Sequence, residues 1–307
     1  MSSSTSAAQV SPRPGPHGGD GDRLAAALGV DPAEVLDLSA SLNPVAPDVA
    51  EMVRGHLDAL TRYPDSGPAT EALARVMGLD PDLVVLTNGG AEAIALVAGE
   101  LRAGWVDEPE FSLYRRHLER LDEAAPRWRS NPHNPTGLLA RPEERAGVWD
   151  EAFWPLATGT WTRRDFERGA VVVGSLTKLL ACPGLRIGYV CCPDREFASH
   201  IRGRQPQWSV NGLAARALPA LLDLVDLPGW AGAVSGLRRD LAAVLKRAGL
   251  QPARSDANWL LVEAPHLREQ LAARAIAVRD CSSFGLPGVV RIAVPDHAGL
   301  ARLEAAL

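Results

Sequence analysis

Short apolar runs alternate with segments of helical periodicity along the first two thirds of the chain. Residues 82–90, DLVVLTNGG, predict a strand that runs into a glycine turn, and the following AEAIALVAGELR predicts a helix that starts at Ala91. Residues 170–178 and 184–192 are apolar runs that predict two more buried strands. Continuous Val and Leu strands separated by helices favour an α/β fold whose mostly parallel sheet is covered on both faces.

The pattern changes after about Pro206. A long stretch rich in Ala, Leu and Arg predicts helix as far as Gly249, and short strands are expected at 258–264 and 289–294, separated by a helix at HLREQLAARA. We therefore expect a large domain at 51–205 and a small α+β domain at 206–307. Residues 1–16 are rich in Ser, Pro and Ala, which predicts a disordered tail.

The overall composition is that of an ordinary globular protein. The chain has 307 residues, of which 46% are hydrophobic and 22% charged, and its net charge is -5. This charge gives no footprint for nucleic acid or an anionic membrane, and no apolar run approaches the roughly 18 residues of a membrane span. The four cysteines fit no metal-ligand spacing, and two of them are adjacent. We expect no metal, no nucleic-acid or membrane partner, and a cytoplasmic protein with reduced thiols.

The segment WRSNPHNPTG, residues 128–137, fixes two asparagines in front of prolines. Each proline disfavours helical geometry in the residue before it, so Asn131 and Asn134 are held extended. For an isolated Asn-Pro pair, a tight turn is the favoured explanation. The rest of the chain has to decide whether one of these amides holds a ligand.

Three further motifs flank this segment, one before it in the sequence and two after it. A strand–Gly-Gly–helix junction at 88–92 would direct backbone amides at an anion. VWDEAF places Asp150 at the end of a short strand, where a cap or turn is the alternative. GSLTKLLACPGLRIGYV carries Ser175, Lys178 and Arg186 in an apolar segment, where a lysine is costly unless its charge is suppressed or used.

Pyridoxal phosphate requires all of these groups together. It needs a lysine amine for covalent attachment and a carboxylate that keeps its ring nitrogen protonated. Its phosphate needs an arginine, hydroxyls and a helix N-terminus, and its phenolic oxygen needs a fixed donor such as the Asn134 amide. The motifs therefore predict this cofactor.

In combination and order, NPHNPTG, DEAF and SLTKLLACPGLRIGY resemble the class I/II aminotransferases, which are pyridoxal-phosphate enzymes of fold type I. The resemblance covers about residues 17–300. It implies a large domain with a mostly parallel, seven-stranded type of sheet, here trimmed, and the small α+β domain. It also implies a homodimer that acts on a small amino acid.

The resemblance assigns the cofactor contacts by position. Lys178 would hold the cofactor covalently and move protons, Asp150 would pair with the pyridine nitrogen, and Asn134 with the phenolic oxygen. Five positions would bind the phosphate: Gly90, Ala91, Glu92, Ser175 and Arg186.

Three more assignments each have a structural alternative. Phe111, in EPEFSLY, matches the aromatic that stacks on the ring, although a plain core position is also open. Tyr63, in RYPD, matches a tyrosine that reaches the phosphate across a dimer interface, or else it completes a turn. Arg291, in VVRIAV, matches the arginine that holds the substrate α-carboxylate, or else it forms a surface ion pair.

The N-terminal segment is similar to that of the threonine-phosphate decarboxylases of cobalamin biosynthesis. HGGD, SASLNP and RYPD carry this likeness, which implies that residues 17–50 cover the active site. His17 and Asn43 would then contact the substrate phosphate or carboxylate, whereas a solvated tail is the alternative for His17. Phe153 agrees, because the related histidinol-phosphate aminotransferases usually have a tyrosine there.

Two departures leave the reaction open. The chain is short of the family pattern at 112–130 and again at 138–149, so part of the substrate pocket is open or rebuilt. Arg291 is consistent with decarboxylation and with transamination, since it only anchors the carboxylate. A degenerate member that binds the cofactor without turnover is the third alternative; the intact Lys178, Asp150, Asn134 and Arg186 argue against it.

Overall fold

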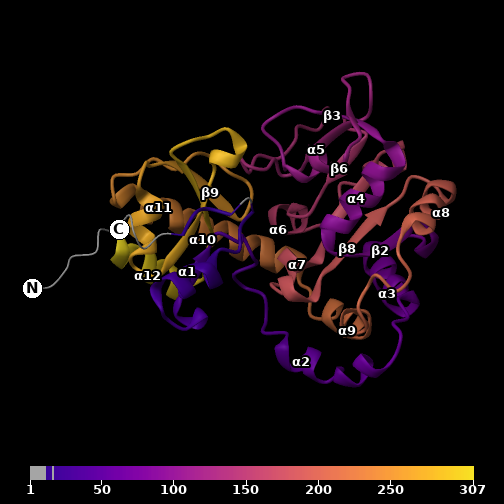
Figure 1. Cartoon of the computed structure of the whole chain (residues 1–307), viewed down its shortest axis with the longest axis horizontal. Coiled ribbons are helices and arrows are strands. Elements are labelled where there is room, and N and C mark those ends of the chain that lie inside the picture. Colours follow the sequence, from indigo (N-terminus) through magenta and orange to yellow (C-terminus); the bar gives the residue numbers. More distant parts are fainter. Residues whose placement is uncertain (1–11, 16) are drawn as a thin grey trace, which may run out of the picture. The chain divides into compact units, whose positions relative to one another are not determined.

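The computed structural model describes residues 12–15 and 17–307, which divide into two units (Figure 1). The large unit comprises Ala46–Asn134 and Leu139–Gly232. The terminal unit comprises the described part of Met1–Val45 together with Pro135–Leu138 and Ala233–Leu307. Residues 206–232 thus pack with the large unit, and β1 (Leu36–Leu38) belongs to the terminal unit, so the units differ from the predicted domain limits at 50 and 205.

A seven-stranded, mostly parallel sheet forms the middle of the large unit, which confirms the predicted fold class. The strand order is β2-β8-β7-β6-β5-β3-β4, and only β8 runs antiparallel to its two neighbours. The strands are β2 (Val84–Asn88), β3 (Ala103–Val106), β4 (Arg120–Leu121), β5 (Arg127–Ser130), β6 (Val148–Asp150), β7 (Val171–Ser175) and β8 (Ile187–Cys191). The buried β7 and β8 correspond to the two apolar runs of the sequence.

Eight α-helices accompany this sheet in the described chain. They are α2 (Ala50–Arg54), α3 (Gly67–Met77), α4 (Gly89–Leu101), α5 (Leu113–His117), α6 (Trp154–Thr158), α7 (Leu176–Leu179), α8 (Arg195–Arg204) and α9 (Gly212–Leu222). Between Gly137 and β6 the chain forms neither helix nor strand, whereas the segment 112–130, where a lost strand–helix unit was expected, contains α5, β4 and β5, and the sheet keeps seven strands.

Helix α4 packs its apolar side chains against the sheet. Ala93, Ile94 and Val97 are buried in a cluster with β7 and β8 side chains. Tyr114 and Trp128 pack against the same cluster with ring centroids 5.4 Å apart. Aromatic side chains bury about 150–250 Å² each, so these two fix the position of α5 on the sheet.

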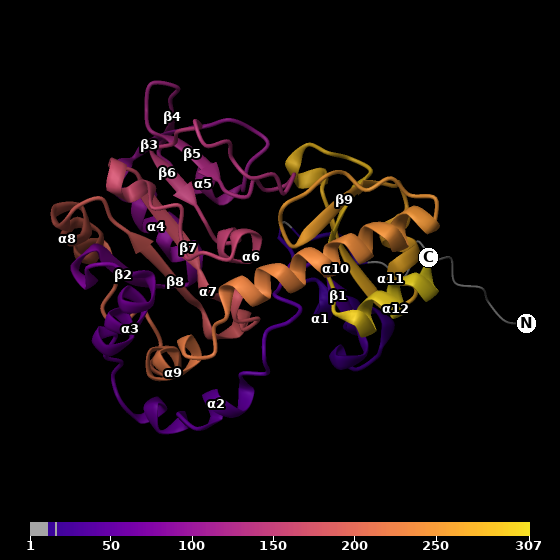
Figure 2. The same ribbon diagram turned by 180° about the vertical axis from the view of Figure 1, so that it is seen from behind.

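The terminal unit contains a four-stranded sheet in the order β1-β10-β11-β9 (Figure 2). Its strands are β1, β9 (Trp259–Glu263), β10 (Ile276–Asp280) and β11 (Val289–Ala293), and its helices are α1 (Gly21–Leu28), α11 (Leu267–Ala272), α12 (His297–Ala306) and most of α10 (Leu227–Arg247). β1 pairs with β10 in parallel, whereas the other pairs are antiparallel. The α+β character follows the prediction, but the N-terminal strand was not anticipated.

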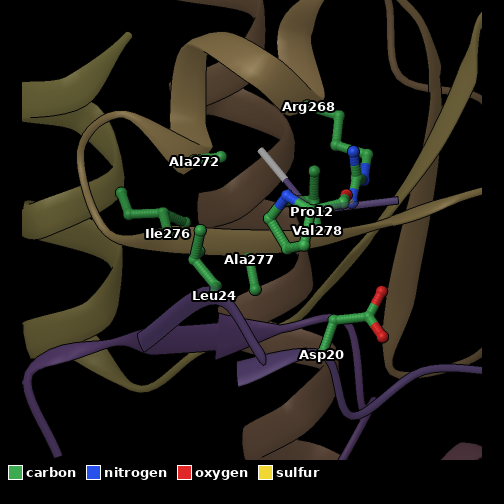
Figure 3. Close-up of a pocket in the computed structure, with 8 residues that line it drawn as sticks. All are labelled: Pro12, Asp20, Leu24, Arg268, Ala272, Ile276, Ala277 and Val278. Atoms are coloured by element: carbon green, nitrogen blue, oxygen red, sulfur yellow. Dashed lines mark hydrogen bonds between the residues drawn. The ribbon is translucent and has the colours of Figure 1, made fainter. Parts of the chain in front are cut away.

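The start of the described chain is held against α11 and β10. Residues 1–11 and 16 of the predicted disordered tail lie outside the described residues. Within residues 12–15, the carbonyl oxygen of Pro12 accepts a hydrogen bond of 2.6 Å from Arg268, and that of Gly15 accepts one from Arg279. Figure 3 shows Pro12 and Arg268 beside a small, mainly apolar pocket that also includes Leu24. None of the predicted site residues lines this pocket.

Among the described residues, no single helix has the length and apolar character needed to cross a membrane. Helices α9 and α10 meet that criterion only together, as a pair with a bend of 91° between them.

Candidate active site

The N-terminus of α4 and the Arg186 guanidinium meet at Gly89. A Cβ atom on Gly89 would lie 2.4 Å from the Nη2 atom of Arg186, so a residue with a side chain would displace the guanidinium. Gly89 also has φ +78°, which favours glycine. The 13-residue helix α4 thus begins with a cation beside its first residue, at the end of the helix where the backbone amides favour an anion. It begins two residues before the predicted Ala91.

Ser175 completes this corner of the large unit. An added Cβ on Gly90 would lie 3.3 Å from the Cβ and 3.8 Å from the Oγ of Ser175. The Oγ of Ser175 is in turn 2.8 Å from the hydroxyl of Thr177. Helix amides, two hydroxyls and a guanidinium therefore come together, which is the donor set that a phosphate dianion requires.

The carboxylate of Glu92 belongs to the structure of the helix start rather than to a ligand site. It accepts hydrogen bonds from the Asn88 amide at 2.7 Å, from Gln205 at 3.2 Å and from Ser209 at 3.1 Å. These contacts hold the negative charge at α4 and join the helix to the loop that precedes α9. The part of Glu92 that is left for the predicted phosphate contact is its backbone amide.

Asp150 lies at the end of β6 and is fixed by two donors. Its Oδ2 accepts a hydrogen bond of 2.8 Å from the phenol of Tyr114, and its Oδ1 accepts one of 2.9 Å from the Ala152 amide. Burial raises the pKa of Asp150, while these two hydrogen bonds and the nearby charge of Lys178 lower it. A buried carboxylate in this position is stabilised by a cationic partner, which fits the protonated ring nitrogen of pyridoxal phosphate.

The sequence analysis did not single out Tyr114. Its side chain is fully buried, and burial together with the charge of Asp150 raises its pKa well above the usual value, so it remains a neutral donor. The signal was present in EPEFSLY, where Tyr114 stands three residues after Phe111, as the second residue of α5.

Lys178 lies on α7, directly after β7, and its charge acts on Asp150. The chain has only one other lysine, Lys246, which is exposed on α10. Apart from these two lysines, the Lys and Arg positions of the chain are all arginine, so a lysine at position 178 is unusual in this sequence. The rarity of lysine in the chain is thus a second sequence signal for Lys178, independent of the motifs.

Asn134 is held through its backbone. Its amide donates to the Oγ of Ser130 at 2.8 Å, and Asn134 itself is buried. Phe111 packs edge-on against Tyr114, with ring centroids 5.8 Å apart and an interplanar angle of 83°. Asn134, Phe111 and Asp150 all belong to the large unit. Their contacts with the cofactor stay predictions.

Tyr63 lies elsewhere on the large unit, on the surface. It is 78% exposed and stacks on Trp208, which is 57% exposed, with ring centroids 4.4 Å apart. Leu57 and Leu60 are exposed nearby in the sequence. The predicted contact of Tyr63 with the phosphate of a partner subunit stays a prediction.

Arg291 and Arg279 form a pair of buried cations in the terminal unit. They are cross-strand neighbours on β11 and β10, and their exposed fractions are 6% and 2%. The Arg291 guanidinium lies 5.0 Å from the ring centroid of Trp259. Burial lowers the pKa of Arg291 to about 10, which still leaves a cation at neutral pH. Like charges directly opposite each other repel, so an anion bound here would be stabilising.

His17 and Asn43 lie on two segments of the terminal unit that the structure brings together. The Gly19 and Asp20 amides donate to the Oγ of Ser39 at 2.9 and 3.0 Å, so HGGD is attached to the strand exit of SASLNP. Asn43 is buried, and its Oδ1 accepts a hydrogen bond of 3.1 Å from the Val45 amide. The position of both segments in one unit agrees with a shared role, which remains a prediction.

Comparison with known proteins places these motifs in a family. The model of the family "Aminotransferase class I and II" matches residues 128–307. The chain belongs to this family. A threonine-phosphate decarboxylase of Salmonella typhimurium is 31% identical over 95% of this chain and 95% of its own length. A histidinol-phosphate aminotransferase of Stutzerimonas stutzeri is 32% identical over 86% of this chain and 87% of its own length.

Solved structures of the family share the fold. The histidinol-phosphate aminotransferase of Sinorhizobium meliloti, solved in complex with pyridoxal-5'-phosphate, matches with a TM-score of 0.80 and 19% identity, and covers 100% of this chain and 97% of its own. The L-threonine-O-3-phosphate decarboxylase of Porphyromonas gingivalis matches with a TM-score of 0.76 and 21% identity over 89% of this chain and 98% of its own. At these identities the likeness concerns the fold.

Proposed function

We propose that this family member is a pyridoxal-phosphate enzyme that decarboxylates a small phosphorylated amino acid, in the manner of a threonine-phosphate decarboxylase. The cofactor assignment is supported by the meeting of the α4 N-terminus, Arg186 and Ser175 at one corner of the large unit. The nearby charge of Lys178, which lowers the pKa of Asp150, supports it as well. When bound, pyridoxal phosphate supplies an electron sink for the substrate α-carbon. The residues of the chain would bind the cofactor, orient it and transfer protons beside it.

Each residue has a distinct task in this proposal. The Lys178 amine attaches the cofactor and then transfers a proton at the substrate. Asp150, kept ionised by the Tyr114 and Ala152 donors, holds the proton on the ring nitrogen. Asn134 donates to the phenolic oxygen, which Phe153 cannot do because its ring has no polar atom.

The substrate class is supported by the terminal unit. An amino acid with a phosphate carries two anionic groups, and Arg291 and Arg279 provide two buried guanidiniums on adjacent strands. Arginine is suited to carboxylate and phosphate because its planar donors bind both in pairs. Arg291 would hold the α-carboxylate, and Arg279 together with His17 and Asn43 would provide donors for the second anion.

Transamination is the second candidate, because the chain is similar to histidinol-phosphate aminotransferases at 32% identity. The two reactions differ in which bond of the α-carbon lies perpendicular to the cofactor ring. Incubation with threonine phosphate alone, or with histidinol phosphate and a 2-oxo acid, separates them. Carbon dioxide from the first mixture supports decarboxylation, whereas a new amino acid in the second supports amino transfer.

A homodimer belongs to the same proposal. The stacked pair of Tyr63 and Trp208, with Leu57 and Leu60, presents apolar side chains that a second copy of the chain would cover. Light scattering should give twice the chain mass of 32.7 kDa. A Tyr63→Ala Trp208→Ala double variant should shift the protein towards monomer, and full activity in a monomer would contradict a site shared between subunits.

A further inference from the structure

Glu110 is a buried carboxyl group next to the ring-stacking position, and no role described so far uses it. It is 2% exposed. Its Oε1 accepts a hydrogen bond of 3.1 Å from the Ser130 amide, and its Oε2 lies within hydrogen-bonding distance of the Ser130 hydroxyl. Its Oε2 also accepts a hydrogen bond of 3.4 Å from the amide of Phe111.

Ser130 connects Glu110 to three parts of the cofactor site. Its hydroxyl oxygen accepts the hydrogen bond from the Asn134 amide at 2.8 Å. The same hydroxyl also acts on Tyr114, because hydrogen bonding by Ser130 lowers the pKa of the phenol against the larger effect of burial, and the phenol donates to Asp150 at 2.8 Å. A continuous chain of side chains therefore leads from Glu110 through Ser130 and Tyr114 to Asp150.

The Ser130 hydroxyl has one proton and two possible acceptors, the Glu110 carboxyl and the Tyr114 oxygen. When Glu110 is ionised, the proton points to its carboxylate and the Tyr114 oxygen loses a donor. When Glu110 is neutral, its own proton can be donated to Ser130, and the Ser130 proton is then available to Tyr114. Hydrogen bonds in such a chain strengthen one another, so Tyr114 is the better donor to Asp150 when Glu110 is neutral.

We propose that Glu110 is a positioning residue that controls, through the single proton of Ser130, how firmly Tyr114 holds Asp150. The ionised form also places a second negative charge near Asp150. Both effects act in the same direction, because both raise the pKa of Asp150. The inference rests on the proposed cofactor role of Asp150 and specifies which residue regulates it.

The charged and titratable groups around Glu110 allow both of its forms near neutral pH. Arg129 on β5 lies 3.4 Å from Oε1 and favours the ionised form, while the charge of Asp150 on β6 opposes it. His133 lies 3.7 Å away, but burial lowers its pKa to about 4, so it is neutral. Tyr114 on α5 is neutral as well. Burial is the largest effect and raises the pKa of Glu110 to about 8, so the change falls at mildly alkaline pH.

The test compares pyridoxal-phosphate binding to the apoprotein at pH 7 and pH 9, for the wild type, Glu110→Gln and Glu144→Gln. Glutamine keeps the size of Glu110 and stays neutral at both values. Glu144 is the matched control, because it also pairs with Arg129 but makes no contact with Ser130. The pH dependence of the cofactor itself is common to all three proteins and cancels in the ratio of their dissociation constants.

On the change from pH 7 to pH 9, the wild type and Glu144→Gln should lose roughly tenfold more affinity than Glu110→Gln, the effect of one pKa unit of coupling. An equal loss in all three overturns the proposal. Tyr114→Phe provides a second test that leaves Glu110 in place. It should remove the part of the additional loss that passes through Ser130 and keep the part due to the second negative charge, so its loss should be smaller than that of the wild type. A full wild-type response in this variant would contradict the proton chain.

Infrared difference spectra of the apoprotein give a readout without cofactor. Glu151 also has a pKa of about 8, so a protonated carboxyl band that disappears in this range is expected in both proteins. A band that is stronger in the wild type than in Glu110→Gln, and that disappears from their difference near pH 8, would show the titration of Glu110 directly. Its absence from the difference between the two proteins overturns the assignment. Failure of the wild type to bind pyridoxal phosphate at either pH is a different result, because it contradicts the proposed function.

Discussion

Around their predicted site residues, the large unit buries carboxyl groups and the terminal unit buries guanidinium groups. Glu110 and Glu151 in the large unit are each at most 2% exposed, and burial raises the pKa of both to about 8. Arg279 and Arg291 in the terminal unit are also buried, yet they remain charged at neutral pH. Carboxyl groups can change charge near neutrality and guanidiniums cannot. The cofactor region is therefore open to regulation by protons, whereas the terminal unit offers a permanent positive charge to a substrate.

The largest effect should come from Lys178, the residue proposed to hold the cofactor covalently. Lys178→Ala is expected to abolish the cofactor adduct that borohydride fixes, because the chain has only one other lysine. Lys246→Ala is the matched control, since Lys246 is exposed on α10, and it should retain the adduct. Mass spectrometry of the reduced proteins measures both. An adduct that remains in Lys178→Ala would show that the attachment site is wrong.

The next largest effect should come from Asp150, the carboxylate whose pKa is lowered by the charge of Lys178. Asp150→Ala should retain measurable cofactor but lose kcat by about a hundredfold or more, because an unprotonated ring is a poor electron sink. Tyr114→Phe removes one donor to Asp150 and should lose less. Steady-state kinetics with the better substrate separates the two variants. Near-native turnover of Asp150→Ala would contradict the role given to this residue.

Substitution of the buried arginine Arg291 in the terminal unit should change KM. Arg291→Ala is expected to raise KM roughly ten- to a hundredfold, since a charge-assisted hydrogen bond contributes about 1.5–3 kcal/mol. Its cofactor affinity should be unchanged, which is the opposite of the result for Lys178→Ala. Arg239→Ala, an exposed arginine on α10, is the control and should behave as wild type. Equal KM values for Arg291→Ala and the wild type would restrict Arg291 to a structural role.

The same comparison explains how far sequence reasoning reached. The residues proposed to bind the cofactor in the large unit lie in short motifs at strand ends and helix starts, so Lys178, Asp150 and Asn134 could be proposed from local order. The mostly parallel sheet followed from apolar runs in the same way. Only the packing of α5 on the sheet, however, brings Tyr114 within 2.8 Å of Asp150, and no local pattern shows this contact.

The terminal unit was harder to predict for a physical reason. β1 pairs with β10 across more than two hundred residues of chain, and the neighbouring positions of Arg279 and Arg291 depend on the register of two strands. Register is set by the burial pattern of the whole sheet rather than by a motif. Arg279 was therefore not singled out, whereas Arg291 was proposed from its motif. The division into units places α9 with the large unit, beyond the limit predicted at 205.

A smaller effect, on the free energy of unfolding, is expected from the buried carboxyl group of Glu151. The pKa of Glu151 is raised from 4.5 to about 8, so the folded protein holds a proton that the unfolded chain releases between these values. The free energy of unfolding should therefore fall as pH rises from about 4.5 to about 8. Glu151→Gln should show a shallower fall, by about 2–4 °C in Tm for each kcal/mol removed. Parallel Tm profiles for the variant and the wild type would contradict a neutral Glu151.

The smallest effect, and the finest test of the terminal unit, concerns His17. HGGD is attached to Ser39 by two amide hydrogen bonds, which holds His17 near the chain that leads to Asn43. If His17 contacts a substrate phosphate, His17→Ala should raise KM for threonine phosphate by about tenfold, the lower end for a charge-assisted hydrogen bond, because its side chain is only partly buried. KM for plain threonine should change little. If the segment only packs the N-terminus onto the unit, the variant should lower Tm and leave the ratio of kcat/KM for the two substrates unchanged. Equal losses with both substrates would thus assign His17 to the fold, and a loss confined to the phosphorylated substrate would extend the anion site beyond Arg279 and Arg291.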